Sequence, residues 1–398
     1  MTGEVGVRQR RTIRIVFSVL AATTIVLGTY LYLSTNEARA VGALMDLDCS
    51  VSFIKPESKP KGLKRWLRSW LAQRYFDPVS AIDFPFDATD AELKYLERVG
   101  TLRWLDLSGT QVSDSGMTQL SGLRSLEILD LNLTGITDSG LAHLVGLPSL
   151  RALHLINTPV TDKGLEEISQ IVSLKALSIS NSHQVTDLGL THLANCHEME
   201  SLLLDGTAIT DLGCTHLSRL SLLKQLRLNR TTVADRGVKA IHGLASLEYL
   251  GLNDTRVTDD GMVSVAQMPS LVTLDIRNTD VGDSGCRYLA ESKALGSLDL
   301  GETQVTDAGL VHLVNLKTLK WLALDGTKVT DVGLVHLEEI STLSELKLSH
   351  TLLTEVGLDH LVRIKSLYLL DIQGTQLTDE LMSRIHVALP RVLIRNEP

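Results

Sequence analysis

Apolar residues recur along most of the chain with a period of 24 positions. The repeating unit reads L-x-x-L-x-L-x-x-T-x-V-T-D-x-G-L-x-H-L-x-x-L-x-x, and one step has 25 residues, with the extra residue near His183. A degenerate copy covers 89–99, and a terminal fragment covers 392–394. The twelve units begin at Leu102, Leu126, Leu150, Leu174, Met199, Leu223, Leu247, Leu271, Leu295, Leu319, Leu343 and Leu367.

The two halves of this unit predict a strand and a helix. In L-x-L the alternate residues point the same way, so each copy predicts a short strand with leucines inward. The following G-L-x-x-L-x-x-L has helical spacing and predicts a short helix with one buried side. A unit of this size buries its apolar face only by stacking on its neighbours. The predicted fold is an α/β solenoid, with a parallel sheet on the concave face and short helices on the convex face.

Three polar positions repeat with the leucines and are interpreted as framework. The threonine after the strand is replaced only by Ser182, and its hydroxyl is predicted to satisfy backbone groups in a buried turn. The aspartate, replaced only by Glu355, is predicted to be a helix N-cap. The glycine two residues later, present in eleven of the twelve units, predicts a close backbone approach.

The repeat resembles the leucine-rich repeat family over residues 78–398. The T-D-x-G-L half is similar to the cysteine-containing subclass of F-box adaptors and to bacterial membrane-anchored leucine-rich repeat proteins. This resemblance implies a horseshoe-shaped solenoid that binds other molecules. No F-box is recognisable, so an F-box-like substrate adaptor is not expected.

The amino end predicts a membrane anchor. Residues 15–33 are free of charge and would form about 28 Å of helix, close to the hydrocarbon thickness of a bilayer. Four arginines lie in the preceding 1–14, which predicts a cytoplasmic basic tail and an extracytoplasmic solenoid. The alternative is a signal peptide cleaved after Ala40, in Ala38-Arg39-Ala40, which would give a secreted or periplasmic protein.

Residues 34–60 show no clear periodicity and are predicted to be a linker. The next section, 61–101, is interpreted as an amphipathic amino-terminal cap and the degenerate repeat, before twelve repeats at 102–391 and a carboxyl-terminal edge at 392–398. Within 61–76 the residues Leu63, Trp66, Leu67, Trp70 and Leu71 have the spacing of an apolar helical stripe, with Lys64, Arg65 and Arg68 on the other face. This segment either covers the open first unit, where Trp104 would meet it, or lies on anionic headgroups.

Charge separates the amino end from the solenoid. The formal net charge is −9, but residues 1–77 hold 12 Lys/Arg against 6 Asp/Glu, so they carry +6 and the remainder carries −15. Aromatic residues make up only 4%, which fits many small packing units better than one large core. An acidic solenoid argues against nucleic acid as a partner, because phosphate binding needs a basic surface.

Residues with catalytic or metal-binding chemistry recur too often to form one site. Pairs such as Asp307/His312 appear in five units, so they are interpreted as framework. His312, His336 and His360 would stack, but the same position accepts other residue types, and no metal or cofactor is expected. No P-loop, G-x-S-x-G, H-E-x-x-H or dinucleotide motif is present, so no enzymatic activity is predicted.

The four cysteines lack C-x-x-C spacing. Cys214 and Cys286 replace the leucine after the glycine, and Cys196 replaces the last helical leucine. These three are therefore predicted to be small buried residues without disulfides.

Recognition is expected from the outward strand residues, which differ from unit to unit. Arginine and tyrosine dominate binding hot spots, and both gather in units six to eight. The alternative is a solvated face whose charges cancel, with Arg277 against Asp275. The candidate binding residues are Arg227, Arg230, Tyr249, Asn253, Arg256, Asp275 and Arg277.

These features together predict a membrane-anchored, non-enzymatic scaffold that binds a protein through the concave face of its solenoid. An envelope glycan is an alternative ligand. A structural spacer, or an envelope-organising protein without a dedicated ligand, is the alternative function.

Overall fold

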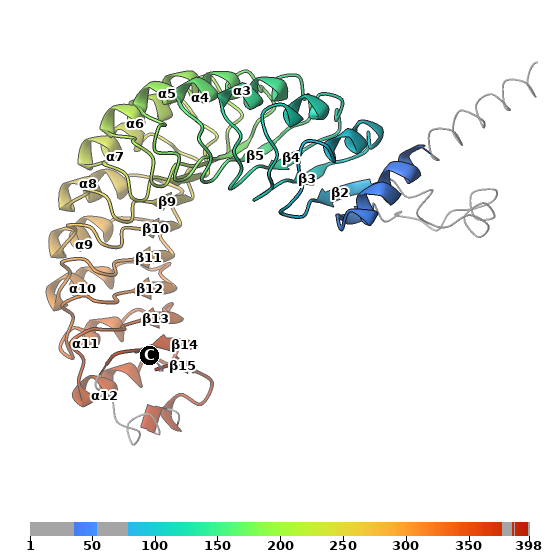
Figure 1. Cartoon of the computed structure of the whole chain (residues 1–398). Coiled ribbons are helices and arrows are strands. Elements are labelled where there is room, and N and C mark those ends of the chain that lie inside the picture. The colour runs from blue at the N-terminus through green and yellow to red at the C-terminus, as the bar shows by residue number, and fades with distance from the viewer. Residues whose placement is uncertain (1–35, 54–78, 376–383, 386, 397–398) are drawn as a thin grey trace, which may run out of the picture.

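The computed structural model describes residues 36–53, 79–375, 384–385 and 387–396. These form an arch in which the helices follow the outer side and one continuous sheet lines the inner side (Figure 1). The predicted anchor at 15–33 and the predicted cap at 61–76 lie outside the described residues. Among the residues that are described, no helix has the length and hydrophobicity needed to cross a bilayer.

The sheet contains fifteen strands in chain order. All pairings are parallel except the first, in which β1 runs antiparallel to β2. Twelve strands, β3 to β14, correspond to the twelve units. The strands are β1 Ser50–Phe53, β2 Val79–Asp83, β3 Trp104–Asp106, β4 Ile128–Asp130, β5 Ala152–His154, β6 Ala176–Ser178, β7 Ser201–Leu203, β8 Gln225–Arg227, β9 Tyr249–Gly251, β10 Thr273–Asp275, β11 Ser297–Asp299, β12 Trp321–Ala323, β13 Glu345–Lys347, β14 Leu369–Asp371 and β15 Leu393–Arg395.

Short helices connect the strands on the convex side. Residues 36–46 are also helical and precede β1. The 3-10 helices are η2 Leu93–Arg98, η3 Gly116–Leu120, η4 Ala142–Leu144 and η5 Glu355–Gly357. The α-helices are α3 Asp138–Leu141, α4 Asp162–Ile168, α5 Asp187–Leu193, α6 Asp211–Leu217, α7 Asp235–Ile241, α8 Asp259–Val265, α9 Asp283–Leu289, α10 Asp307–Leu313, α11 Leu334–Leu337 and α12 Leu358–Leu361.

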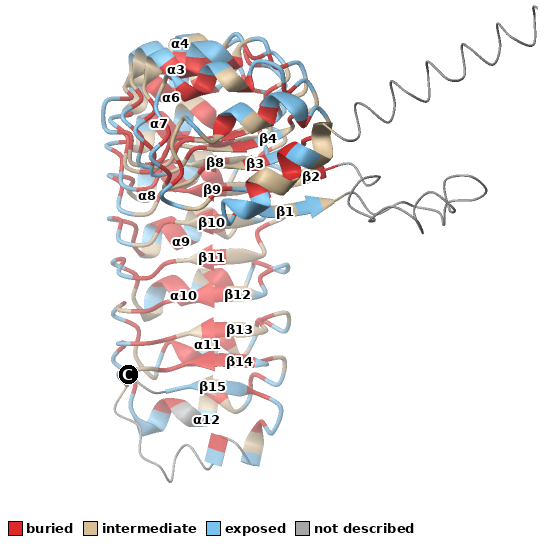
Figure 2. Cartoon of the chain, turned by 45° about the vertical axis from the view of Figure 1, so that its right-hand side comes forward, coloured by how far each residue is buried: buried red, intermediate tan, exposed pale blue. Residues whose placement is uncertain are grey.

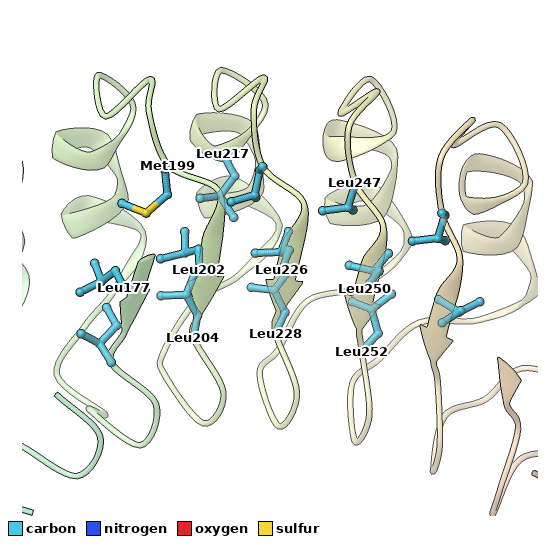
Figure 3. Packing of buried hydrophobic residues seen from close by; sticks show 14 of the residues in the cluster. Leu177, Met199, Leu202, Leu204, Leu217, Leu226, Leu228, Leu247, Leu250 and Leu252 are labelled. Carbon is cyan, nitrogen blue, oxygen red and sulfur yellow. The ribbon is translucent and has the colours of Figure 1, made fainter. Parts of the chain in front are cut away.

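The core lies between the sheet and the helices and runs the length of the array. In each unit the two strand leucines point into it, as Leu202 and Leu204, then Leu226 and Leu228, show in Figure 3. These four side chains are fully buried. Figure 2 shows the burial continuing from unit to unit. Each buried leucine contributes roughly 1.5–3 kcal/mol, so the repeated leucines supply most of the stabilising free energy.

The predicted linker over 34–60 is wrong for its described part. The helix at 36–46 buries Ala40, Val41 and Leu44 in the core, at helical spacing. In β1 the side chains of Val51 and Phe53 pack against the same core. The amino end of the solenoid is therefore closed by this helix and an antiparallel strand, which a search for 24-residue periodicity does not detect.

The framework role of the threonines is confirmed. In eleven units the Thr hydroxyl donates to the backbone carbonyl three residues earlier, at 2.6–2.7 Å, as Thr303 does to Leu300. The exception is the unit with 25 residues. There Ser182 donates to the carbonyl of Thr158 in the preceding unit, at 3.2 Å.

The aspartates are not helix N-caps, contrary to the prediction. In α3 to α6, α8 and α10 the N-cap is the preceding threonine, whose hydroxyl accepts the N–H two residues later, as Thr186 does from Leu188. In α7 and α9 the N-cap position holds Ala234 and Gly282. The aspartate is the first helical residue, and its carboxylate accepts two hydrogen bonds from the next unit. Asp187, for example, accepts from the N–H and the hydroxyl of Thr210, at 2.8 and 2.6 Å. The carboxylates therefore connect neighbouring units.

The recurring glycine lies against that carboxylate, which confirms the predicted close approach. A Cβ on Gly164 would lie 2.5 Å from Oδ1 of Asp138 in the preceding unit. The same overlap of 2.5–2.7 Å would occur in several other units, including at Gly261 and Gly309. The Asp and the Gly therefore form one contact that is repeated between units.

Candidate protein-binding face

The concave face consists of three columns of side chains that run across the strands. Strand pairing aligns Gln225, Tyr249 and Thr273 in one column, and Arg227, Gly251 and Asp275 in the next. The third column follows the second strand leucine and includes Asp205, Asn229, Asn253, Arg277 and Asp325. Neighbouring strands lie about 4.8 Å apart, so side chains of adjacent units are within contact distance.

Several polar residues on this face are structural. At the end of each strand, a backbone N–H points along the face and needs an acceptor. Asp275 Oδ1 accepts this N–H from Arg277 at 3.2 Å, and Asp299 accepts it from Gly301 at 2.9 Å. In other units the acceptor comes from the preceding strand, since Asn229 Oδ1 accepts the N–H of Asn253 at 2.8 Å.

Arg227 forms an ion pair with a buried carboxylate. Its Nη2 lies 2.7 Å from Oδ2 of Asp205, whose side chain is only 3% exposed. Asp205 also accepts the backbone N–H of Asn229. Removal of the arginine would leave this carboxylate buried without its partner, which is costly. Arg227 is thus as much a structural residue as a surface one, and Asp205 is a site residue that the sequence interpretation missed.

Tyr249 is half-buried beside this ion pair. Gly251, on the same strand, has no side chain and separates Arg227 from Asp275 in the middle column. Burial and the nearby Asp275 carboxylate raise the pKa of the Tyr249 phenol, although Arg227 opposes the shift. Within the described part of the chain, the Tyr249 hydroxyl has no hydrogen-bond partner. The tyrosine therefore presents an apolar ring and a free polar group.

Arg277 extends across the next two units. Its guanidinium lies 3.2 Å from Oε1 of Glu302 and 3.7 Å from Oδ2 of Asp325. Gly301 makes room for it, because a Cβ there would overlap Nη1 of Arg277. The alternative of a face whose charges cancel locally therefore has Glu302 and Asp325, instead of Asp275, as the ion-pair partners of Arg277.

The carboxylates of β10 to β12 are crowded. Burial raises the pKa of Asp299 to about 6, and the neighbouring Asp275 and Asp325 add to the shift. Burial also raises the pKa of Asp275, against the Arg277 N–H bond and the Arg227 charge. Asp299 and Asp325 were not among the predicted site residues. Their signal was present in the sequence, as acidic residues at outward strand positions.

Two predicted residues lie away from the concave cluster. Arg230 occupies the turn after β8, with a φ of 55°, where four other units have glycine. Its Nη2 donates to Oδ1 of Asn181 at 3.4 Å, and it lines a shallow pocket of about 260 Å³ with His183. Arg256 is exposed on the turn after Thr255. Both are close to the cluster in sequence, but the chain turns away before it reaches them.

The cysteines are buried and unpaired, as predicted for three of them. Cys196 is 9% exposed, Cys49 is 6% exposed, and Cys214 and Cys286 are fully buried. Burial raises the pKa of the Cys214 thiol to about 12 and that of Cys49 to about 11. These thiols are therefore protonated and unreactive at neutral pH.

His360 contacts a carboxylate of the preceding unit. Its Nδ1 lies 2.6 Å from Oε1 of Glu338. No group of three or more His, Cys, Asp or Glu with metal-ligand geometry is present among the residues that the structure describes.

A repeat array with one continuous inner sheet, whose outward side chains differ from unit to unit, belongs to the class of solenoid proteins. A sequence profile described as "Leucine Rich repeat" matches residues 101–121, 122–145 and 267–290. The repeat, the sheet and these matches identify the chain as a leucine-rich repeat protein. The Thr-Asp-x-Gly-Leu subclass remains a prediction.

Solved structures share the fold. An internalin (inlF) from Listeria monocytogenes is 22% identical, with a TM-score of 0.60, and the match covers 83% of this chain and 92% of that protein. A leucine-rich repeat protein from Leptospira interrogans is 17% identical, with a TM-score of 0.50, covering 76% and 80%. The comparison with curated proteins found no match.

Proposed function

We propose that this protein is a non-enzymatic scaffold that binds a partner protein through the concave face of β8 to β10. The observation that carries this proposal is Tyr249, a half-buried tyrosine with a free hydroxyl between the Arg227–Asp205 pair and Asp275. Tyrosine and arginine combine contact area with directional hydrogen bonds, which is why they dominate binding hot spots.

Unpaired polar atoms support the same zone. Three buried side-chain polar atoms have no hydrogen-bond partner in the described part of the chain, and two of them, Arg227 Nε and Asn253 Oδ1, lie in β8 and in the turn after β9. Native structures tolerate few such atoms. Their presence beside Tyr249 favours a surface selected for binding over one selected only for stability.

The proposal includes the membrane anchor at 15–33, with the solenoid on the extracytoplasmic side. The cleaved alternative would cut after Ala40, inside the helix at 36–46. Ala40 is 1% exposed there, and Val41 and Leu44 pack in the same core, so cleavage would remove part of the end of the solenoid. This favours retention of the amino-terminal segment. Intact mass of the protein isolated from membranes tests it, and a chain that begins at Val41 would contradict it.

Affinity capture from native membranes with the full chain tests the binding role. We expect Tyr249→Ala to weaken capture of a specific partner about 10-fold or more, since loss of a hot-spot residue costs about 2 kcal/mol. Tyr288→Ala, on the convex helix α9, is the matched control and should leave capture unchanged. Arg227→Ala is less informative, because it also leaves Asp205 unpaired. A spacer without a ligand predicts that neither tyrosine matters.

A further inference from the structure

The amino-terminal end of the concave face carries an apolar column beside an acidic one. Strand pairing aligns Ala81 with Trp104 and Trp104 with Ile128, and it aligns Asp83 with Asp106 and Asp106 with Asp130. The two columns are two residues apart along the strands, so they lie side by side on the same face. We call these residues the amino-terminal concave patch: Ala81, Asp83, Trp104, Asp106, Ile128 and Asp130.

The apolar column of this patch is open to solvent. Trp104 is 49% exposed and Ile128 is 38% exposed on adjacent strands. The next two residues in the same column are small, Ala152 and Ala176. Large apolar side chains that lie next to each other on a surface mark a contact site more often than isolated ones do.

The acidic column forms no ion pair with the described part of the chain, and the next residue in this column is His154, which opposes the raised pKa of Asp130. No ion pair within that part reaches Asp83, Asp106 or Asp130. Asp106 and Asp130 each use one oxygen to accept the strand-end N–H, from Ser108 and Asn132. Burial raises the pKa of Asp83 and of Asp130, and the Asp106 carboxylate adds to both shifts. Three adjacent carboxylates therefore favour a cationic occupant.

A cationic segment of the same chain is attached beside this patch. Residues 54–78 join Phe53 to Val79, and these two residues are paired across β1 and β2. The segment therefore begins two strands from β3, which carries Trp104, and ends one strand from it. Within it, residues 61–76 hold five Lys/Arg and no Asp/Glu. Tethering of this kind gives effective concentrations of about millimolar, so even a weak contact would be populated.

The residue order of 61–76 matches the two columns. On a helix, at about 100° per residue, Leu63, Trp66, Leu67, Trp70 and Leu71 would form one apolar stripe. Lys64 and Arg68 would follow beside Leu71 on one side of it, so that a basic stripe would run next to the apolar one. The patch has the complementary arrangement, an apolar column next to an acidic one.

We propose that residues 61–76 bind the amino-terminal concave patch, with Trp66 and Trp70 against Trp104 and Ile128 and the basic stripe toward the three aspartates. The contact would shield the apolar end of the sheet and leave β8 to β10 open. It does not depend on the proposed partner site.

Acrylamide quenching of Trp104 tests this proposal in the full chain. Trp66→Phe, Trp70→Phe and Trp321→Phe together leave Trp104 as the only tryptophan. The protein is placed in phosphatidylcholine nanodiscs, which offer no anionic headgroup. We expect reversal of Lys64, Arg65 and Arg68 to Glu to raise the quenching constant about two-fold, because the exposed half of Trp104 loses its cover.

A charge swap distinguishes a specific contact from a general effect on folding. Asp83→Lys, at a residue whose side chain makes no hydrogen bond within the described region, should restore part of the shielding when it is combined with the reversed segment. Carbodiimide cross-linking of the unmodified chain should join Lys61 or Lys64 to Asp83, Asp106 or Asp130, as read by mass spectrometry.

Anionic nanodiscs test the competing membrane role. If the proposal holds, Trp104 stays shielded when phosphatidylglycerol is added to the nanodiscs. Loss of shielding there would assign 61–76 to the headgroups and overturn the proposal. A quenching constant that is unchanged by charge reversal in phosphatidylcholine, together with no cross-link to the three aspartates, would also overturn it.

Discussion

The turns leading into the convex helices and the concave face are built from the same repeat, but they use their polar residues differently. On the helix side, the Thr, Asp and Gly of one unit make the same contacts as those of the next, as Asp187 with Thr210 and Asp235 with Thr258 show. On the concave side, the aligned positions hold Arg227, Gly251 and Asp275. A contact that recurs in every unit identifies framework residues. Aligned positions whose residues differ from unit to unit identify where binding specificity can vary.

Part of the concave face is also framework, because some of its side chains bond the backbone. Asp275 and Asp299 accept strand-end N–H groups, and Asp205 holds both Arg227 and a backbone N–H. Tyr249 has no such role in the described structure. A side chain on this face is therefore a candidate for recognition only after its backbone bonds have been accounted for.

The largest effect is expected from a variant that breaks the repeated Asp–Gly contact between units. Gly261→Ala would place a Cβ 2.6 Å from Oδ1 of Asp235 and 2.8 Å from Cγ1 of Val257. We expect a loss of about 2–3 kcal/mol in the free energy of unfolding, measured by urea titration. Gly243→Ala, where no atom lies within 4 Å, is the control and should be neutral or slightly stabilising. Equal effects of the two variants would contradict this account.

The second prediction removes the carboxylate itself. Asp235→Ala deletes the acceptor of the Thr258 N–H and hydroxyl bonds, both 2.8 Å long. The loss should be about 2 kcal/mol by the same titration, because two partly buried donors lose their partner. Asp260→Ala, in the first turn of α8 and exposed, should change stability by less than about 0.5 kcal/mol. If both variants lie within that limit, the carboxylates do not connect the units.

A smaller effect is expected from the turn threonine. Thr303→Val keeps the shape but removes the 2.6 Å bond to the Leu300 carbonyl in a buried turn. We expect about 1–1.5 kcal/mol of destabilisation. Thr191→Val, on an exposed helical position, serves as the control. A Thr303 variant as stable as the control would show that the hydroxyl column is dispensable.

The smallest effect depends on pH and lies on the concave side. The Asp299 pKa of about 6 in the folded protein exceeds its ordinary 3.8, so the folded state holds this proton more tightly than the unfolded state. The contribution to stability is therefore fully present only below about pH 4 and is lost as the pH rises through 6. Asp299→Asn should flatten the unfolding free energy between pH 4.5 and 7 relative to wild type. An unchanged slope would refute the shift.

The sequence predicted the architecture well because the same strand and helix pattern recurs in every unit. The strand, the helix and the Thr303 type of bond are local to one unit and can be derived from it. The Asp187–Thr210 hydrogen bond joins two units. The sequence of a single unit does not show it, and the aspartate was therefore predicted to be a helix N-cap. The helix at 36–46 and β1 fall outside the period, and their burial of Leu44 and Phe53 depends on the end of the stack.

The candidate site was predicted in part for the same reason. Arg227, Tyr249, Asp275 and Arg277 occupy outward strand positions, and periodicity aligned them correctly. Arg230 and Arg256 follow the strands, where the backbone turns away, and sequence distance alone placed them in the cluster. Which outward residues are used by the backbone, such as Asp205, depends on hydrogen bonds that only the assembled sheet shows.

One paired measurement tests the central claim most directly: stability and partner capture determined on the same two variants. The account predicts that Tyr249→Ala loses capture about 10-fold and unfolds near the wild-type denaturant concentration, whereas Thr303→Val unfolds earlier and captures the partner normally. If Tyr249→Ala captured normally while Thr303→Val lost capture without losing stability, the repeated residues would be the binding site and the account would be wrong.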